Sequence, residues 1–278
     1  MIATVAEALP HLTVSEICRV LGCARSTYYY QPVERDAVAL VNAVERVLMR
    51  YPFYGYRRVR AQLAREGLSL GETRVRKVLA WLGVTRRVGP VRVQTTDSKH
   101  AHWRYPNLIR GMRPTRPNQV WVADITYIRL GTRFIYLAVV LDTYSRAIRG
   151  WCLSRSLTQG ITLVATRMAL AAATPLIFHS DQGSQYAAWL HTDLLTTAGV
   201  HISMSDPGKP QQNGIAERFM RTLKEEHVDY TEYANFDDAY QQLAHWLEVE
   251  YNTHRVHSAL GYATPAEFED ASPHPLLN

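Results

Sequence analysis

The segments VWVADITYI at residues 120–128 and FIYLAVVLD at residues 134–142 decide the fold class of this 278-residue chain. Both are rich in β-branched and aromatic residues, and apolar side chains occupy both alternating faces, which is typical of central strands. Further strands are predicted at residues 147–154, 176–181 and 201–205, and helices at residues 160–173, 186–199 and 215–226. This order predicts an α/β core, a mixed five-stranded sheet with flanking helices.

The residues before this core show helical patterns instead. Residues 11–30 predict two short helices, the first opened by the capping-box pair Thr13 and Glu16. An amphipathic helix at residues 34–50 and two more in RRVRAQLAREG and GETRVRKVLAWLG predict a second unit of this kind. Helix-turn-helix pairs present their second helix to a DNA groove, although two small packed helices also occur without that function.

The predicted organisation follows from these changes of pattern along the chain. Residues 85–118 are basic, have little apolar periodicity and contain four prolines, so we expect a linker that lies on nucleic acid or on a partner subunit. Near the end, FDDAYQQLAHWLEVEYN predicts a further amphipathic helix, and Thr264 with Glu267 predicts a capped one. The expected parts are a helix-turn-helix at 1–33, a second helix-turn-helix domain at 34–84, a basic linker at 85–118, the α/β core at 119–228 and a helical extension at 229–278.

Composition excludes several classes of protein. With 47% apolar and 20% charged residues, the chain is not a disordered one. No apolar run approaches the roughly 20 residues of a membrane span, and the N-terminus lacks the pattern of a secretion signal. Three cysteines are too few for a disulfide framework. A zinc site at Cys18 and Cys23 is not favoured, because no CxxC or paired His motif lies near them. We therefore expect a soluble intracellular protein without membrane contact.

The charge is divided unevenly between the two halves. Residues 1–118 contain 20 Lys and Arg against 8 Asp and Glu, whereas residues 119–278 contain 11 against 17. Nearly all the basic residues are arginines, whose guanidinium groups suit phosphate recognition, so the front half predicts nucleic-acid binding. An ordinary solvated basic surface is the alternative. The candidate DNA contacts in the front half are Arg25, Arg57, Arg58, Arg74, Arg76 and Lys77.

Three acidic residues are distinguished by their positions. Asp124 lies inside an apolar strand, where a carboxylate is unfavourable unless a cation or hydrogen bonds hold it. Asp181 ends the strand LIFHSD, where α/β sheets place ligands, and Glu217 lies in the first turn of the helix at 215–226. Capping and the helix dipole alone also favour acids at the last two positions. Asp142, at the end of the second strand, is a rival fourth acid.

Other side chains near these acids have two interpretations each. On the helix at 215–226, Arg221 and Lys224 share a face with Glu217, which favours DNA contact over an ordinary charged helix surface. His179 is a candidate proton carrier, although a hydrogen-bonded structural histidine is favoured. The loop DPGKPQQNG at 206–214 is expected to be mobile until DNA binds.

Several long motifs resemble one protein family in their order along the chain. They are YPFYGYRRV, QVWVADITYI, LAVVLDTYSR, HSDQGSQY, SMSDPGKPQQNGIAERFMRTLKEE and YNTHRVHSALGYATPAEF. Together they resemble the integrase-core transposases of bacterial insertion sequences, a group within the retroviral integrase superfamily, and most of all the OrfB-type proteins of insertion-sequence family three. The resemblance covers residues 36–270.

The resemblance implies an RNase H-like fold with a DDE metal site formed by Asp124, Asp181 and Glu217. It matches Lys224 to a basic residue of the family and Asp142 to a position that is not a metal ligand. Gln182 stands where Arg is frequent and Ala123 where a hydroxylated residue is frequent, which affects only the details of DNA contact. Gln182, Lys209, Arg221 and Lys224 complete the candidate DNA contacts. The implied cofactor is Mg²⁺ or Mn²⁺, with two ions per site.

The function expected from these features is DNA transposition. The enzyme would cleave the ends of an insertion sequence and transfer the freed 3′-OH to a second strand, with double-stranded terminal repeats and target DNA as partners. The resemblance also implies a homo-oligomer on DNA and an upstream-frame protein as fusion or partner. It further implies a bacterial cytoplasmic protein that is associated with the nucleoid when bound to DNA. The alternatives are an RNase H-like nuclease and a non-catalytic DNA-binding regulator derived from a transposase.

Overall fold

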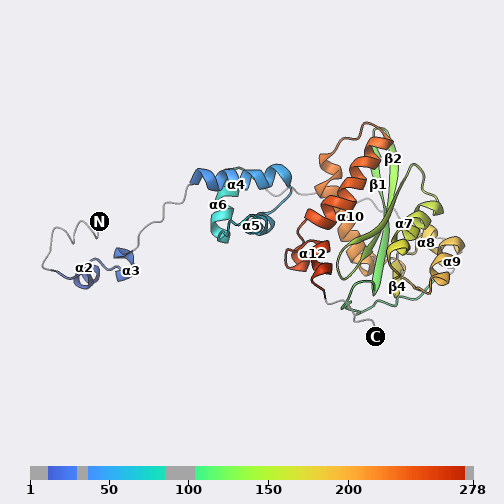
Figure 1. The fold of residues 1–278 in the computed structure, drawn as a ribbon, viewed down its shortest axis with the longest axis horizontal. Coiled ribbons are helices and arrows are strands. Elements are labelled where there is room, and N and C mark those ends of the chain that lie inside the picture. Colours follow the sequence, from blue (N-terminus) through green and yellow to red (C-terminus); the bar gives the residue numbers. More distant parts are fainter. Residues whose placement is uncertain (1–11, 30–36, 85–103, 273–278) are drawn as a thin grey trace. The chain divides into compact units, whose positions relative to one another are not determined.

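The computed structural model describes residues 12–29, 37–84 and 104–272 (Figure 1). By its contacts the chain divides into two units, residues 1–45 and residues 46–278, and the division falls inside helix α4 (Ala37–Arg50). The contacts thus do not divide the chain at residue 34, and the other expected boundaries stay predictions. Within the described ranges no helix is both long enough and apolar enough to cross a membrane.

The described part of the first unit contains the two short helices expected there. Helix α2 (Val14–Val20) begins with the predicted capping box, in which the Thr13 backbone N–H donates to Glu16 Oε2 at 2.8 Å. Helix α3 (Arg25–Tyr28) follows after a turn. Ile17 is buried on the inner side of α2, as the apolar pattern predicts.

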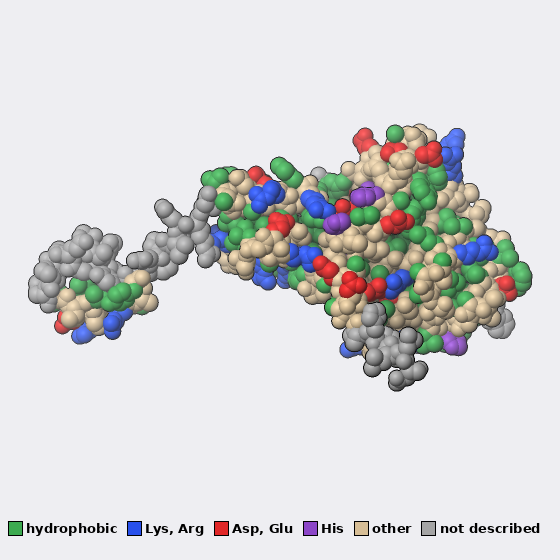
Figure 2. Space-filling model, viewed as in Figure 1, with side chains coloured by type: hydrophobic (Ala, Val, Ile, Leu, Met, Phe, Trp, Pro, Cys, Tyr) green, Lys and Arg blue, Asp and Glu red, His purple; other side chains and the backbone are tan. Residues whose placement is uncertain are grey.

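The second unit begins with the rest of α4 and two further helices, α5 (Tyr56–Arg65) and α6 (Glu72–Trp81). Val59 and Leu63 of α5 and Val75 of α6 are fully buried. Figure 2 shows Lys and Arg side chains over the segment of α4 to α6 on the viewed face, with acidic side chains beside some of them. The predicted helices α5 and α6 are thus present in the structure. That they bind DNA stays a prediction.

The core is a mixed sheet of five strands in the order β3-β2-β1-β4-β5, which confirms the predicted fold class (Figure 1). Strands β1, β2 and β3 pair antiparallel, whereas β4 pairs parallel with both β1 and β5. The strands are β1 (Val120–Leu130), β2 (Arg133–Asp142), β3 (Ile148–Ser154), β4 (Ile177–Ser180) and β5 (His201–Met204).

Helices cover both faces of this sheet (Figure 1). Because side chains alternate along a strand, Val122 packs with Phe219 of α10 on one face and Ala123 packs with Ile161 of α7 on the other. Strand β3 lies so close to α7 that a Cβ at Gly150 would be 2.2 Å from the Ala165 carbonyl oxygen. The helices of the core are α7 (Gln159–Ala172), α8 (Ser184–Ala187), α9 (Trp189–Thr197), α10 (Gly214–Glu226), α11 (Phe236–His245) and α12 (Pro265–Asp270), with short 3₁₀ turns η2 (Val228–Tyr230) and η4 (Ser258–Leu260).

Two predicted helices differ from the structure. The helix expected at 186–199 is two helices, because Ala188 is extended with ψ 140° and its carbonyl accepts the first hydrogen bonds of α9. The helix expected from Phe236 continues after His245 as the π-helix η3 (Trp246–His254). Apolar periodicity alone does not distinguish a broken or widened helix from a regular one.

The loop at 206–214 contains a 3₁₀ helix, η1 (Pro210–Asn213). The side chain of Gln212 closes this loop, since its oxygen accepts from the Asp206 N–H at 2.6 Å and its amide donates to the Asp206 carboxylate at 2.9 Å. These bonds give the loop a regular shape, while its expected mobility stays a prediction.

The described part of the predicted linker lies against the core. The Leu108 N–H donates to Ser203 Oγ at 2.9 Å, and the Met204 N–H donates to the Pro106 carbonyl at 3.3 Å. Residues 106–108 therefore lie against β5, and Ile109 packs on the core. The expected linker that lies on nucleic acid or on a partner subunit stays a prediction. Residues 85–103 lie outside the described residues.

Candidate active site

Strand pairing brings Asp124 and Asp181 to corresponding positions. The last pair between β1 and β4 is Val122 with His179, and each aspartate lies two residues beyond its member of that pair. Past this point β1 and β4 are no longer paired, so the site opens between them. Asp124 shares its face of β1 with Val122, the face on which α10 packs, and α10 carries Glu217 in its first turn.

The electrostatics link the three acids. Burial of the carboxyl raises the pKa of Asp124 from 3.8 to about 8, and the charges of Asp181 and Glu217 contribute in the same direction. The backbone N–H of Ile125, which donates to Asp124 Oδ1 at 2.8 Å, and the charge of Lys224 oppose this shift. The three acids thus share one environment in which their negative charges repel each other.

The turn after β4 fixes the orientation of Asp181. The Gly183 N–H donates to Asp181 Oδ1 at 2.9 Å, and a Cβ at position 183 would lie 2.9 Å from the same oxygen. Only a glycine leaves this carboxylate in place, because any side chain there would push on Oδ1.

Asn213 connects the start of α10 to the strand that carries Asp124. Its side-chain N–H donates to the Ala123 carbonyl at 3.0 Å, and the residue is buried. Sequence reasoning missed this contact. An asparagine directly before a helix is expected to cap that helix, but here the side chain makes no capping bond and reaches β1 instead.

The two cations of α10 differ in their surroundings. Lys224 is half-buried, with Nζ 4.4 Å from the ring centroid of Tyr127, and burial lowers its pKa while Asp124 is among the charges that raise it. Arg221 is exposed. Lys224 therefore belongs to the environment of the acids, as its shared helix face predicts.

His179 has the structural role that was favoured. Its Nδ1 is 2.8 Å from Ser203 Oγ and its Nε2 is 3.0 Å from Ser205 Oγ, so both ring nitrogens are occupied. Burial lowers the pKa of His179 to about 4, which keeps the ring neutral. It therefore joins β4 to β5.

Asp142, the rival fourth acid, is also structural. It is fully buried and accepts hydrogen bonds from the backbone N–H groups of Asn118 at 2.6 Å, Tyr144 at 2.8 Å and Ser145 at 3.1 Å. Its Oδ2 also lies 3.6 Å from the Arg149 guanidinium. These partners hold the turn after β2 and leave Asp142 no part in the site.

The other candidate DNA contacts are spread over several elements. Arg25 is exposed on α3 of the first unit, and Lys209 is exposed in the loop before η1. Gln182 is buried directly after Asp181, and Arg76 pairs with Glu72 at 2.8 Å on α6. The remaining exposed candidates among the predicted DNA contacts are Arg57 on α5 and Arg74 and Lys77 on α6.

Arg58 belongs to a buried cluster that sequence reasoning missed. Its Nη1 donates to Glu226 Oε1 at 2.6 Å, and Arg255 donates to the same carboxylate through Nε at 2.6 Å and Nη2 at 2.8 Å. The three residues, called the Glu226 cluster below, join α5 to the C-terminal end of α10. No sequence pattern indicates that Arg58 and Glu226, which are 168 residues apart, form an ion pair.

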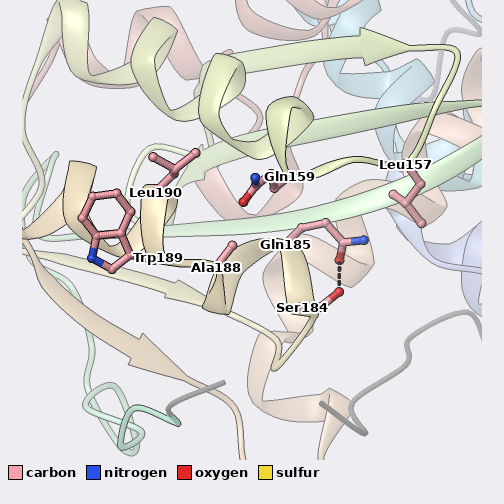
Figure 3. Close-up of a pocket in the computed structure, with 7 residues that line it drawn as sticks. All are labelled: Leu157, Gln159, Ser184, Gln185, Ala188, Trp189 and Leu190. Carbon is pink, nitrogen blue, oxygen red and sulfur yellow. Dashed lines mark hydrogen bonds between the residues drawn. The ribbon is translucent and has the colours of Figure 1, made fainter. Parts of the chain in front are cut away.

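A groove is formed by α8, the start of α9 and residues at the start of α7 (Figure 3). It has a volume of about 490 Å³, and Trp189 at its edge is 69% exposed. Ser184 and Gln185, which follow Gly183, turn toward each other with a hydrogen bond of 3.3 Å. Its lining residues are Leu157, Gln159, Ser184, Gln185, Ala188, Trp189 and Leu190.

The donor set of the acids fits a hard divalent cation. Carboxylate oxygens are the ligands that Mg²⁺ and Mn²⁺ prefer, and a bound cation would offset the repulsion that raises the pKa of Asp124. In the side-chain positions of the described residues, no three His, Cys, Asp or Glu groups are already gathered closely enough to hold an ion.

Comparison with known proteins gives matches over nearly the whole chain. The integrase core domain family matches residues 114–210, and a second integrase core domain family matches residues 198–265. A 31 kDa protein of insertion element IS600 from Shigella sonnei is 34% identical over 266 residues, which cover 91% of this chain and 97% of that protein. The transposase for IS904 from Lactococcus lactis is 34% identical over 220 residues, 78% of this chain and 87% of that protein.

A third relative, the transposase for IS629 from Shigella sonnei, is 32% identical and covers 93% of this chain and 92% of its own length. Among solved structures, a chain of a simian T-cell lymphotropic virus intasome aligns with a TM-score of 0.51 at 21% identity, over 79% of this chain and 73% of that chain. This structural likeness supports the fold.

Proposed function

Because this chain belongs to the integrase-core transposases of insertion sequences, we propose that it cleaves the ends of such an element and joins them to target DNA. The observation that supports this reaction is the placement of the acids. Asp124 and Asp181 lie two residues beyond the last β1–β4 pair, and Glu217 lies in the first turn of the helix that packs on β1. The alternatives, a nuclease and a non-catalytic regulator, are not favoured.

In this proposal Asp124, Asp181 and Glu217 hold Mg²⁺ or Mn²⁺. Two such ions would stabilise the attacking and leaving oxygens of an in-line phosphodiester displacement. Asp181 is oriented by Gly183, and Asn213 keeps the start of α10 at β1, so the three carboxylates are held in place by the fold. Water attacks first and leaves a free 3′-OH, which then attacks a second phosphodiester, and the protein supplies no nucleophile.

The cations near the acids would bind the DNA backbone. The charges of Lys224 and Asp124 act on each other, and exposed Arg221 is one turn away from Lys224 on α10, so both cations can approach phosphates that enter the site. Lys209, Gln182 and the exposed cations of α3, α5 and α6 are proposed as further contacts. Double-stranded element ends and target DNA are the proposed substrates, bound by a homo-oligomer, with an upstream-frame protein as a proposed partner.

The test is cleavage and joining of labelled duplex DNA that carries candidate element ends, with Mg²⁺ or Mn²⁺. Glu217→Gln is compared with Glu225→Gln, which makes the same charge change at an exposed position of α10. Joined products that are lost only in Glu217→Gln are expected. Cleavage that persists in Glu217→Gln would show that the site is assigned wrongly.

A further inference from the structure

The loop before α10 is tied to the segment that precedes the core in the sequence. The side-chain Nδ2 of Asn107 donates a hydrogen bond to Gln212 Oε1 at 2.9 Å, although the two residues are 105 positions apart. The Asn107 side chain is itself oriented, because its Oδ1 accepts from the Ile109 N–H at 3.1 Å and Ile109 packs on the apolar core. Asn107 is therefore a donor that the core holds in place beside Gln212.

The same segment binds the loop at a second point, Asp206. Gln212 joins this residue to its own end of the loop, since Oε1 accepts from the Asp206 N–H at 2.6 Å and Nε2 donates to Asp206 Oδ2 at 2.9 Å. Arg110 Nη2 donates to the same carboxylate oxygen at 2.5 Å. The hydrogen bond from Gln212 and, to a lesser extent, Arg110 lower the pKa of Asp206, so the carboxylate stays ionised and keeps both donors.

This loop leads directly into the helix that carries Glu217. Asn213, the residue after Gln212, is buried and donates to the Ala123 carbonyl at 3.0 Å, which anchors the chain to β1. Helix α10 begins at the next residue, and Glu217 lies in its first turn. Because α10 is a continuous helix that packs on β1, a shift at its start moves Glu217 with it.

We propose that Asn107 and Gln212 are positioning residues that hold Glu217 where it can bind a divalent cation together with the two aspartates of the site. The inference rests on the proposed function, because it requires that the three acids share an ion. Removing a group that orients a metal ligand weakens ion binding about 10–100-fold, and misplacing a reacting group by about 1 Å slows a reaction by up to about 100-fold. The segment before the core thereby supports the active site in addition to connecting it to the front helices.

The experiment compares Asn107→Ala, Gln212→Ala and the double variant with the wild type, all as the full chain. Mn²⁺ binding is measured by electron paramagnetic resonance of the free ion, and the melting temperature is measured on the metal-free protein. The kcat and KM for cleavage of labelled duplex DNA are measured alongside. Gln242→Ala is the matched control, because it removes a comparable hydrogen bond, from Gln242 Nε2 to Asp238 Oδ1 at 2.8 Å on α11. Since Asn107 and Gln212 are only half-buried, their variants are expected to stay folded.

Gln212→Ala is expected to weaken Mn²⁺ binding about tenfold or more and to lower kcat with the KM for DNA unchanged, and Asn107→Ala is expected to act in the same direction. The double variant should bind Mn²⁺ no more weakly than Gln212→Ala, because both substitutions act through one hydrogen bond. Gln242→Ala should bind Mn²⁺ as the wild type does.

Three results would overturn this inference alone. They are wild-type Mn²⁺ affinity in Gln212→Ala, fully additive effects in the double variant, and a raised KM for DNA with unchanged kcat, which would assign the loop to DNA binding instead. A wild-type protein that binds no Mn²⁺ would overturn the proposed function together with it.

Discussion

Replacing Glu226 by glutamine should destabilise the second unit strongly. The Glu226 side chain is 4% exposed and accepts three charge-assisted hydrogen bonds, one from Arg58 and two from Arg255. Glutamine keeps the shape but leaves two guanidinium groups without their counter-charge, and removing one partner of a buried ion pair costs about 3–5 kcal/mol. At about 2–4 °C per kcal/mol for a unit of this size, the melting temperature should fall by roughly 6–20 °C.

The assay is thermal and denaturant unfolding of the full chain, with Glu225→Gln as the control. Glu225 is the next residue of α10 and is exposed, so its substitution should change stability by less than about 0.5 kcal/mol. Although burial opposes it, pairing with Arg255 and Arg58 lowers the pKa of Glu226 below 4.5. The cluster therefore stabilises the protein above pH 4.5, and this contribution is lost as the pH falls through the lowered pKa, where the two variants should converge.

Two results would refute this reasoning. One is a Glu226→Gln variant with the stability of Glu225→Gln at neutral pH. The other is a difference between the two variants that stays constant as the pH is lowered well below 4.5, because such a difference would not come from the carboxylate charge.

Three further predictions concern the acids and their supports. Gly183→Ala should lower cleavage at least tenfold while the melting temperature changes little, because the added Cβ displaces Asp181 Oδ1; unchanged cleavage rates would contradict this. The metal-free protein should lose stability as the pH rises from about 4 to about 8, because the folded pKa of Asp124 lies above its ordinary 3.8, and denaturant unfolding of Asp124→Asn should show a smaller slope. Asn213→Ala should cost about 1–2 kcal/mol in unfolding measurements through the lost bond to the Ala123 carbonyl, and should reduce cleavage further than this loss of stability explains.

The strands and most helices of this fold are predictable from local pattern. Residues 120–128 and 134–142 are apolar on both faces, and a sheet covered by helices on both sides is the structure that buries them. The break at Ala188 and the π-helix from Trp246 were not predictable, since both preserve the apolar spacing that a regular helix would show.

The residues of the site also differ in how well the sequence predicts them. Asp124 and Asp181 were recognisable because each is a carboxylate at an unusual place in a strand pattern. Asn213 was not, because it resembles an ordinary helix cap, and only its hydrogen bond to the Ala123 carbonyl distinguishes it. Long-range pairs of this kind leave no periodic trace in a sequence.

The Glu226 cluster has a consequence for the exchange of parts between related transposases. Arg58 lies on α5, before the core in the sequence. Its guanidinium nevertheless pairs with the carboxylate of Glu226, which is buried at the C-terminal end of α10. A chimera that takes its front helices from a relative without an arginine at this position would leave one side of Glu226 uncompensated. The front helices and the core therefore cannot be recombined freely, and compatibility at this ion pair limits which front segments the core accepts.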